Sequence, residues 1–317
     1  MKLKAPLLIF LTLLTSCSNT NLVITDKVFC FDTMFEIKLY DGDKTDIEEI
    51  ESTFNKLNQL TDNYQARSIN NIYTINNTNE SVTIDEGLYD LLKLSFDFQN
   101  NVSNYFNPLC GNLAKKWKES LKNLQILDEI SINEELDKIK NTSVDLSNIN
   151  SAQRIGEAEI DLGGVAKGYA LDQVFQYLDN SDINHYLING GRSSILLGEK
   201  KSSDGLFNVG LSDINNAYLK LKNCFVSTSG VSTQGVTING ITYSHIINPI
   251  DGSAVNKHDT VIVISSSGFL GDALSTTMML CDIDEIKELE NKCNVQTIVI
   301  DEGQIIYQNE NVQIYKH

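Results

Sequence analysis

The sequence predicts an α+β fold with mixed or antiparallel sheets and packed helices, arranged as one large domain or two intimately associated subdomains. The chain has 317 residues, enough for a substantial core, and its composition is globular, with 41% hydrophobic residues and three prolines. Stretches with the apolar spacing of helices and short apolar runs typical of strands are partly segregated along the chain. Such segregation favours α+β over a regular alternation of strands and helices.

The elements follow from periodicity, in chain order. Val28–Tyr40 alternates apolar and polar residues and is expected to be one strand, whereas Asp46–Leu60 carries the apolar stripe of a helix. The other expected helices, each with that apolar spacing, are 88–98, 109–121, 164–179, 270–281 and 283–292. The other expected strands, each a short apolar run, are 185–189, 194–197, 207–211, 218–226, 242–247, 260–265 and 295–300. The polar, Asn-rich segment 140–153 is expected to be a loop or a domain boundary.

The N-terminus is predicted to be a signal peptide over residues 1–16. Two lysines precede Ala5–Leu14, an apolar run too short to span a bilayer. The next residues, LTSC, resemble a bacterial lipobox, so Cys17 is predicted to be lipidated and to anchor the mature chain to a membrane. An ordinary signal peptide with a chance cysteine is the alternative. The predicted organisation is a signal peptide over 1–16, a lipidated tether over 17–26 and a folded domain over 27–317.

Charge and cysteine content exclude several classes of protein. The net charge of −17 argues against nucleic acid as a partner, because little here could neutralise a phosphate backbone. It also requires that an anionic ligand be held by local groups, such as a metal or backbone amides. Of six cysteines, lipidation of Cys17 would leave five, so no complete disulfide framework is implied. The four histidines do not have the spacing of a zinc site.

The stretch 160–173, IDLGGVAKGYALDQ, is a candidate anion-binding turn. Gly163 and Gly164 come just before a predicted helix, whose free N-terminal amides favour an anion. Lys167 lies one turn into that helix, and Asp161 is placed to accept hydrogen bonds from a ligand. The spacing matches neither a P-loop nor a dinucleotide fingerprint. A tight strand-to-helix turn with a surface lysine explains this segment about equally well.

The stretch 268–281, GFLGDALSTTMMLC, is a candidate metal site. Asp272, Ser275 and Thr276 fall on one face of a predicted helix. A carboxylate with two hydroxyl groups is an oxygen-only set that suits Mg²⁺. The alternative is a helix cap made by Asp272, with the hydroxyl groups bonded back to the helix.

Three further segments are weaker signals when each is taken alone. YLINGGRSSILLG, at 186–198, places a Gly-Gly turn between two apolar strands and is explained by a structural hairpin. CFVSTSG, at 224–230, ends a strand in small hydroxyl residues and glycine. SHIINPIDG, at 244–252, has His245 on an apolar strand, where a histidine is more often structural than catalytic.

Together, DLGGVAKGYALD, INGG, VSTSG, SHIINPIDG and GDALSTTMML, in this order, resemble the FAD:protein FMN transferase (ApbE) family. The family shows D-x-G-G-x-A-K-G-x-x-x-D, N-x-G-G, T-S-G, H-I-x-[DN]-P-x-x-G and A-D-A-x-x-T. The N-terminal half agrees less closely: Tyr64, Ser68 and Asn76 match a Y-x-x-x-S…N pattern, and YFNP at 105–108 matches G-x-F-D-P. The resemblance covers nearly all of residues 28–310 and implies an ApbE-like fold. Many family members are also lipoproteins, which agrees with Cys17.

The resemblance implies a role for each matching residue. The residues implied to contact FAD are Phe31, Tyr64, Tyr105, Phe106, Asn107, Asp161, Lys167 and Ile247. The residues implied to hold Mg²⁺ are Gly164, through its carbonyl, Asp272, Ser275 and Thr276. The residues implied to take part in catalysis are Asp161, Lys167 and His245, of which Asp161 and His245 are candidates for the general base.

The chain departs from the family pattern at four places. Phe31-Asp32-Thr33 stands where M-G-T is usual, and Asn107 replaces an aspartate. The turn 189–192 lacks the usual acid after its glycines, and Asn248 replaces the commoner aspartate before proline. The metal helix and the D-x-G-G turn are intact.

The activity that the resemblance implies is Mg²⁺-dependent transfer of FMN from FAD to a Thr or Ser hydroxyl group of an acceptor protein, with release of AMP. The implied partners are FAD, an acceptor flavoprotein such as a membrane redox-pump subunit, and a membrane through the lipid anchor, with no nucleic acid. The expected location is the bacterial cell envelope, facing the periplasm. Two alternatives are an FAD pyrophosphatase that produces FMN and AMP, and a non-catalytic flavin-binding lipoprotein.

Overall fold

A computed structural model of the chain describes residues 23–211, 213–231 and 235–316. The predicted signal peptide and the lipidation site Cys17 lie outside the described residues. Strand β1 begins at Ile24, inside the segment 17–26 that was predicted as a tether. In the part of the chain that is described, no helix combines the length and apolar character needed to cross a membrane.

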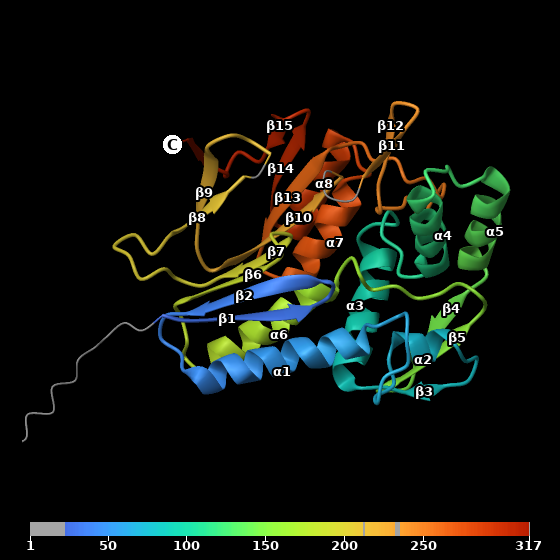
Figure 1. The fold of residues 1–317 in the computed structure, drawn as a ribbon, viewed down its shortest axis with the longest axis horizontal. Coiled ribbons are helices and arrows are strands. Elements are labelled where there is room, and N and C mark those ends of the chain that lie inside the picture. Colours follow the sequence, from blue (N-terminus) through green and yellow to red (C-terminus); the bar gives the residue numbers. More distant parts are fainter. Residues whose placement is uncertain (1–22, 212, 232–234, 317) are drawn as a thin grey trace, which may run out of the picture.

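An eight-stranded sheet lies at the centre of the molecule (Figure 1). Each neighbouring pair of its strands is antiparallel. The strands, in spatial order, are β1 (Ile24–Cys30), β2 (Thr33–Leu39), β6 (Tyr186–Gly190), β7 (Ser194–Leu197), β10 (Cys224–Gly230), β13 (Thr260–Ser265), β14 (Gln296–Asp301) and β15 (Gln304–Gln308). An α+β fold with antiparallel sheets is therefore confirmed.

Strand β13 shows how this sheet is covered on both faces, because every one of its residues is buried. Val261 and Val263 belong to the main hydrophobic core, which the helices cover. Ile262 and Ile264 belong to a second apolar cluster. Since successive side chains of a strand point to opposite faces, these two sets pack against two different layers. A continuous apolar run is what a doubly covered strand requires.

The two covering layers are a small sheet and a group of helices. The small sheet has the order β16 (Ile314–Lys316), β9 (Ala217–Leu221) and β8 (Phe207–Gly210). The helices on the main-core face are α1 (Lys44–Leu60), α6 (Ala166–Asn180), α7 (Gly268–Met278) and α8 (Ile283–Cys293). Helix α1 begins with a capping box made by Asp43 and Asp46, and its buried residues form the predicted stripe.

The remaining elements form a flank beside the helical layer (Figure 1). They are α2 (Ile72–Asn76), β3 (Val82–Thr83), α3 (Glu86–Asn101), α4 (Gly111–Lys122), α5 (Glu129–Lys140), β4 (Ser143–Asp145), β5 (Ser151–Ile155), β11 (Val236–Ile238) and β12 (Ile241–Tyr243). Trp117 of α4 stacks on Tyr243 of β12, with ring centroids 5.6 Å apart, and its indole donates to the carbonyl of Gly252 at 2.8 Å. The loop that carries His245 is thereby tied to α4.

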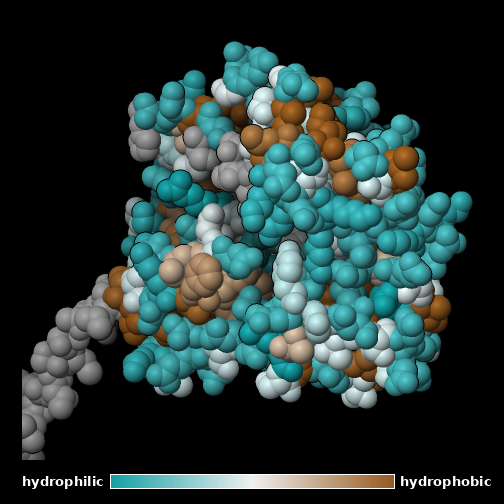
Figure 2. Space-filling view, turned by 45° about the vertical axis from the view of Figure 1, so that its right-hand side comes forward, coloured by the Kyte–Doolittle hydropathy of each residue, from teal (hydrophilic) through white to brown (hydrophobic). Residues whose placement is uncertain are grey.

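The surface of the molecule is consistent with its composition. Hydrophilic side chains cover most of the face that Figure 2 presents, apolar groups lie between them, and the face is hollowed near its centre.

The six predicted helices are confirmed as α1, α3, α4, α6, α7 and α8, with ends that differ by a few residues. The strands predicted at 194–197 and 260–265 have those bounds. The prediction of a single strand over Val28–Tyr40 was wrong. The chain reverses at Phe31 and Asp32, whose φ angles are 49° and 55°. Two residues with positive φ make the type I′ turn of a hairpin. Apolar alternation continues across that turn and conceals it.

Three other expectations were also wrong. The strand predicted at 242–247 ends at Tyr243, so His245 lies in a loop and not on a strand. The strand predicted at 218–226 is divided into β9 and β10 by a turn in which Asn223 has a φ of 50°. The segment 140–153, predicted to be a loop, contains β4 and the start of β5, which pair with each other. Short polar strands of this kind have no apolar periodicity to identify them.

Candidate functional site

The Asp161–Gly164 turn is fixed on several sides. The Asp161 carboxylate accepts a hydrogen bond from the amide of Gly163 at 2.7 Å. The side chain of Asn76 donates to the carbonyl of Ile160 at 2.9 Å and accepts from its amide at 2.8 Å. Both glycines are exposed, so their backbone groups are accessible at the start of α6. The turn is therefore rigid and open to a ligand.

A pocket with a volume of ≈ 330 Å³ opens beside this turn. It brings together Phe31, Tyr64, Asp161 and Lys167, four residues that the sequence predicted to contact FAD. They come from the β1–β2 turn, the loop after α1, and the segment leading into α6. Its lining is aromatic and charged, which suits a flat polar ring attached to an anionic group.

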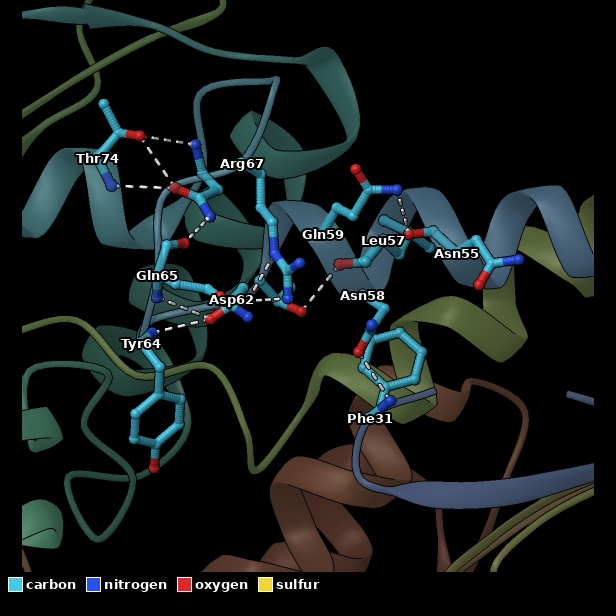
Figure 3. Close-up of polar contacts among 12 residues, drawn as sticks. Phe31, Asn55, Leu57, Asn58, Gln59, Asp62, Tyr64, Gln65, Arg67 and Thr74 are labelled. Carbon is cyan, nitrogen blue, oxygen red and sulfur yellow. Dashed lines mark hydrogen bonds and ion pairs between the residues drawn. The ribbon is translucent and has the colours of Figure 1, made fainter. Parts of the chain in front are cut away.

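Asp62 organises the loop that forms one wall of this pocket (Figure 3). Its carboxylate accepts from the amides of Tyr64 and Gln65 at 2.8 and 3.2 Å and from Nε of Arg67 at 2.8 Å. Burial alone would raise the pKa of Asp62, but the Tyr64 amide and the Arg67 guanidinium outweigh it and hold the pKa below its usual range. Asp62 is therefore ionised and fixes the loop.

Tyr64 projects from this loop with its ring largely exposed. The ammonium groups of Lys115 and Lys118, on α4, lie 5.1 and 5.5 Å from the ring centroid. Lys115 also donates to Glu159 at 2.6 Å. These cation–π contacts hold the ring at the pocket without burying it.

The β1–β2 turn forms another wall. The amide of Phe31 donates to the side-chain oxygen of Asn58, on α1, at 2.8 Å (Figure 3). The Phe31 ring lies 6.0 Å from that of Phe35, centroid to centroid. A bulky residue in the left-handed region is strained, so this hydrogen bond and ring contact hold an otherwise unfavourable conformation.

Asp272 is buried at the contact between α6 and α7. One carboxylate oxygen accepts from the hydroxyl groups of Ser194 and Ser227 at 2.9 and 2.7 Å, and the other accepts from the amide of Gly168 at 2.7 Å. Burial raises the pKa of Asp272, while Lys167 and these donors oppose that rise. Two carboxylate oxygens offer about four acceptor positions, and these three donors occupy three of them.

Further hydroxyl groups lie one turn along α7, where that of Ser275 donates to the backbone carbonyl of Asp272 at 3.1 Å. Ser229, at the end of β10, lies 2.9 Å from the Ser275 oxygen and 3.4 Å from that of Thr276. Gly164 is also close, since a Cβ atom built on it would lie 3.8 Å from the Thr276 oxygen. The structure thus brings Gly164, Asp272, Ser275 and Thr276 to one place, although their role as metal ligands stays a prediction.

The donor set at this place fits Mg²⁺. Across the described ranges, no group of three or more His, Cys, Asp or Glu side chains could hold a metal ion. Mg²⁺ binds through one or two carboxylates together with substrate phosphates, and it accepts hydroxyl and carbonyl oxygens. A single carboxylate beside hydroxyl groups and an exposed glycine turn is such a set.

Lys167 links the two parts of the site. Its ammonium group is close enough to Asp272 and to His245 to shift the pKa of both. The His245 side chain reaches solvent, yet surrounding protein atoms desolvate the ring. This desolvation, together with the charge of Lys167, lowers the pKa of His245. His245 is therefore neutral near pH 7 and able to accept a proton.

Four of the predicted contact residues have side chains outside the pocket lining. Tyr105 places its hydroxyl group 3.5 Å from Glu285, and Asn107 accepts from the amide of Leu109 at 2.9 Å. Phe106 is buried, and its ring lies 3.9 Å from the position that a Cβ atom on Gly164 would take. The ring therefore packs beneath the Asp161–Gly164 turn, on its buried side. Ile247 packs against the cluster around Trp117. Contact of these residues with FAD stays a prediction.

The sequence did not identify several residues that shape the site. Asn58, Asp62 and Arg67 line the pocket, and Ser194 and Ser227 hold Asp272. The pattern D-x-Y-x-x-R at 62–67 is the signal that could have identified the loop, since aspartate often accepts from amides two and three residues later.

A larger open hollow of ≈ 500 Å³ lies around the loop 199–205, away from this turn. Three of its basic side chains already have partners: Lys222 pairs with Glu199 at 2.8 Å, Lys201 donates to the carbonyl of Tyr40 at 2.7 Å, and a ring nitrogen of His185 lies 2.6 Å from Asp41. The smaller pocket is therefore the better candidate for function.

Comparisons with known proteins show which family the chain resembles. A family model described as the ApbE family matches residues 31–299. A Treponema pallidum protein named FAD:protein FMN transferase is 26% identical over 216 residues, covering 62% of this chain and 60% of that protein. A Klebsiella pneumoniae protein of the same name is 27% identical over 206 residues, covering 62% of this chain and 63% of that protein. The aligned parts span less than two thirds of either relative.

The fold agrees as well. The crystal structure of the ApbE protein of Thermotoga maritima superposes with a TM-score of 0.78 at 25% identity, and the match covers 91% of this chain and 97% of that one. Since the family model spans the chain from the β1–β2 turn to strand β14, the chain belongs to the ApbE family.

Proposed function

We propose that this protein transfers FMN from FAD to a Thr or Ser hydroxyl group of an acceptor protein, with Mg²⁺ and with release of AMP. The observation that supports it most is the meeting of the Asp272–Thr276 face with the Gly164 turn beside an aromatic pocket. The relatives named FAD:protein FMN transferase support the same activity.

The pocket residues would bind and orient FAD. Phe31 and Tyr64 offer aromatic faces for a flat ring, and the exposed Gly164 offers a backbone amide for the pyrophosphate. Gly164, Asp272, Ser275 and Thr276 would hold Mg²⁺. When bound there, Mg²⁺ supplies charge stabilisation to the phosphate oxygens. Lys167 would add positive charge where the net charge of the protein, −17, is unfavourable for an anion.

We assign the role of general base to His245, which accepts the proton of the acceptor hydroxyl group. In the transfer step, the acceptor oxygen bonds to the phosphorus on the FMN side, and the bond from that phosphorus to the bridging oxygen breaks. AMP leaves with the bridging oxygen, and the hydroxyl proton passes to an unprotonated ring nitrogen of His245. The lowered pKa of His245 keeps that nitrogen free of a proton near pH 7.

The place of action that we propose is the bacterial cell envelope, facing the periplasm. Residues 1–16 would direct export, and a lipid on Cys17 would anchor the chain. The acceptor would be a flavoprotein of the same compartment, such as a membrane redox-pump subunit.

The test is flavin transfer in vitro. The full chain, purified in detergent, is incubated with FAD, Mg²⁺ and an acceptor domain, and protein-bound flavin is read by gel fluorescence. Covalent fluorescence with an equal amount of AMP is the expected result. An acceptor with its target Thr replaced by Val is the control and should stay unlabelled. AMP and FMN without labelled protein would instead show a pyrophosphatase. If neither labelled protein nor AMP is formed, both enzyme activities are ruled out.

Metal dependence is tested on the same assay. Removing Mg²⁺ with a chelator should stop turnover, and adding it back should restore turnover. Asp272→Asn keeps the shape of the side chain but removes its charge, so we expect kcat to fall by roughly 10²–10³-fold. Full activity of this variant would refute the metal assignment.

A further inference from the structure

Helices α6 and α7 touch backbone to backbone at one point. A Cβ atom on Gly168 would clash with the carbonyl oxygen of Gly268, and one on Gly268 would clash with that of Gly168. The starts of the two helices are therefore closer together than residues with a Cβ atom at these two positions would allow. The pyrophosphate turn leads into α6, and the metal face lies on α7, so this contact sets the separation of the two halves of the site.

Two aspartates make this contact reciprocal. Asp272, from α7, accepts from the amide of Gly168 in the first turn of α6 at 2.7 Å. Asp172, from α6, accepts from the amides of Gly268 and Phe269 in the first turn of α7 at 2.6 and 2.7 Å. The hydroxyl group of Ser267 adds a third donor to Asp172, at 3.1 Å. Each helix thus satisfies free N-terminal amides of the other, where a negative charge is also favoured by the helix dipole.

We propose that Asp172 is a positioning residue, which holds the metal-binding face of α7 at a fixed distance from the Gly163–Lys167 turn. Asp172 does not line the pocket, so it acts through the helix that it holds. This inference rests on the proposed function, because it concerns how the chain places the oxygens that hold the metal.

The geometry of Mg²⁺ makes the site sensitive to this separation. Mg²⁺ requires a near-octahedral set of oxygens at 2.0–2.1 Å, and it tolerates little displacement. Gly164 belongs to the α6 side of the contact, whereas Asp272 and Thr276 belong to α7. A shift of α7 by a few tenths of an ångström would therefore separate the two groups of oxygens. Loss of residues that orient metal ligands typically weakens metal binding by about 10–100-fold.

The test is metal affinity in Asp172→Asn. An amide in place of the carboxylate presents a donor to one of the two amides of α7, so at least one hydrogen bond is lost. Mn²⁺ binding to the full chain with saturating FAD is followed by electron paramagnetic resonance. The Mn²⁺ dissociation constant should rise by about 10–100-fold, while FAD affinity without metal should stay within about twofold. Ser267→Ala removes one donor to Asp172 and should raise the Mn²⁺ dissociation constant by a smaller factor. This variant replaces Asp172→Asn in the test if Asp172→Asn does not fold.

Two control variants separate positioning from general stability. Asp282→Ala removes the cap of α8, where Asp282 accepts from the amides of Asp284 and Glu285. Val174→Ala removes buried apolar atoms from α6 itself. Both should lower the melting temperature but leave the Mn²⁺ constant within about twofold.

Each outcome is decisive. If wild-type protein binds Mn²⁺ and Asp172→Asn binds it equally well, this inference is wrong and the proposed function stands. If the controls weaken Mn²⁺ binding as much as Asp172→Asn does, Asp172 has only a structural role. If wild-type protein binds no Mn²⁺, the metal site fails, and this inference fails with it.

Discussion

His245 and Lys167 illustrate how single residues set the chemistry of this site. Desolvation favours the neutral imidazole, and the ammonium group of Lys167 disfavours a second positive charge beside it. Both effects lower the pKa of His245 below its ordinary value of 6.5. Burial raises the pKa of Asp272, and the same ammonium group opposes that rise. One lysine therefore influences both the proposed base, His245, and the proposed metal ligand, Asp272.

The pH dependence of transfer should follow His245. As pH falls through its pKa the imidazole gains a proton and can no longer act as a base, so kcat should fall with a midpoint below 6.5. Lys167→Met removes the neighbouring positive charge and should move that midpoint to higher pH, besides lowering kcat. A pH–rate profile measures both effects. A midpoint that stays in place in Lys167→Met, or an unchanged acid limb in His245→Gln, would contradict this assignment.

Asp62 makes a second prediction at this scale. Asp62→Asn removes the charge that holds Arg67 and the Tyr64 loop, at a cost of about 1–2 kcal/mol in ligand binding, or roughly 5–30-fold in the FAD dissociation constant. Quenching of flavin fluorescence measures that constant. Asp97→Asn is the control, because it breaks an exposed pair with Lys93 that lies on α3. Equal effects of the two variants would show that Asp62 has no special role.

At the level of elements, the crossing of α6 and α7 decides whether the site forms. Two glycines allow it, and two aspartates hold it. Neither helix could be placed by its own amphipathic pattern alone, since the residues that meet are glycines. The β1–β2 hairpin is a second such element, because its turn lines the pocket and the hydrogen bond from Phe31 to Asn58 ties it to α1.

The crossing predicts the effect of an added methyl group. Gly168→Ala would place Cβ against the carbonyl of Gly268, and we expect a loss of about 1–3 kcal/mol in the free energy of unfolding together with weaker metal binding. Gly210→Ala, in β8, is the control, because nothing lies within 4 Å of its Cβ position. Chemical denaturation compares the two. A Gly168→Ala variant as stable as Gly210→Ala would show that the helices can separate without cost.

At the level of the whole molecule, charge opposes the ligand. The net charge is −17, and the proposed substrate carries a pyrophosphate. In the pocket, local groups oppose this repulsion, namely Lys167, Arg67, which also pairs with Asp62, and the exposed glycine turn. Local binding and distant repulsion have different ranges, since the Debye length is about 10 Å at 0.1 M salt.

Ionic strength should separate these two effects. Salt screens distant repulsion more than contacts inside the pocket, so the association rate of FAD should rise between about 10 and 150 mM salt. Stopped-flow quenching of flavin fluorescence measures this rate. Riboflavin, which has no phosphate, is the control and should show little change. A rate for FAD that falls with salt would mean that local cations, such as Lys118, dominate the approach.

How much the sequence could predict depends on the range of the interactions involved. Helix α1 and strand β13 were predicted because their apolar periodicity is local. The β1–β2 turn was missed because Phe31 and Asp32 adopt positive φ without the glycine or asparagine that usually signals it. The loop around Asp62 was missed because its contacts with Tyr64 and Arg67 depend on conformation and not on pattern.

The sequence by itself determined the chemical groups of this protein: the glycine turn with Lys167, the carboxylate and hydroxyl oxygens of one helix face, and the ordered motifs of its family. These are properties of residue type and short spacing, which a linear chain displays. Only the tertiary structure decided that Asp172 holds the start of α7, 96 and 97 residues away, and that Asp272 holds the start of α6. The physical reason is that buried amides and carboxylates must find partners, and the folded chain decides which partners are within reach.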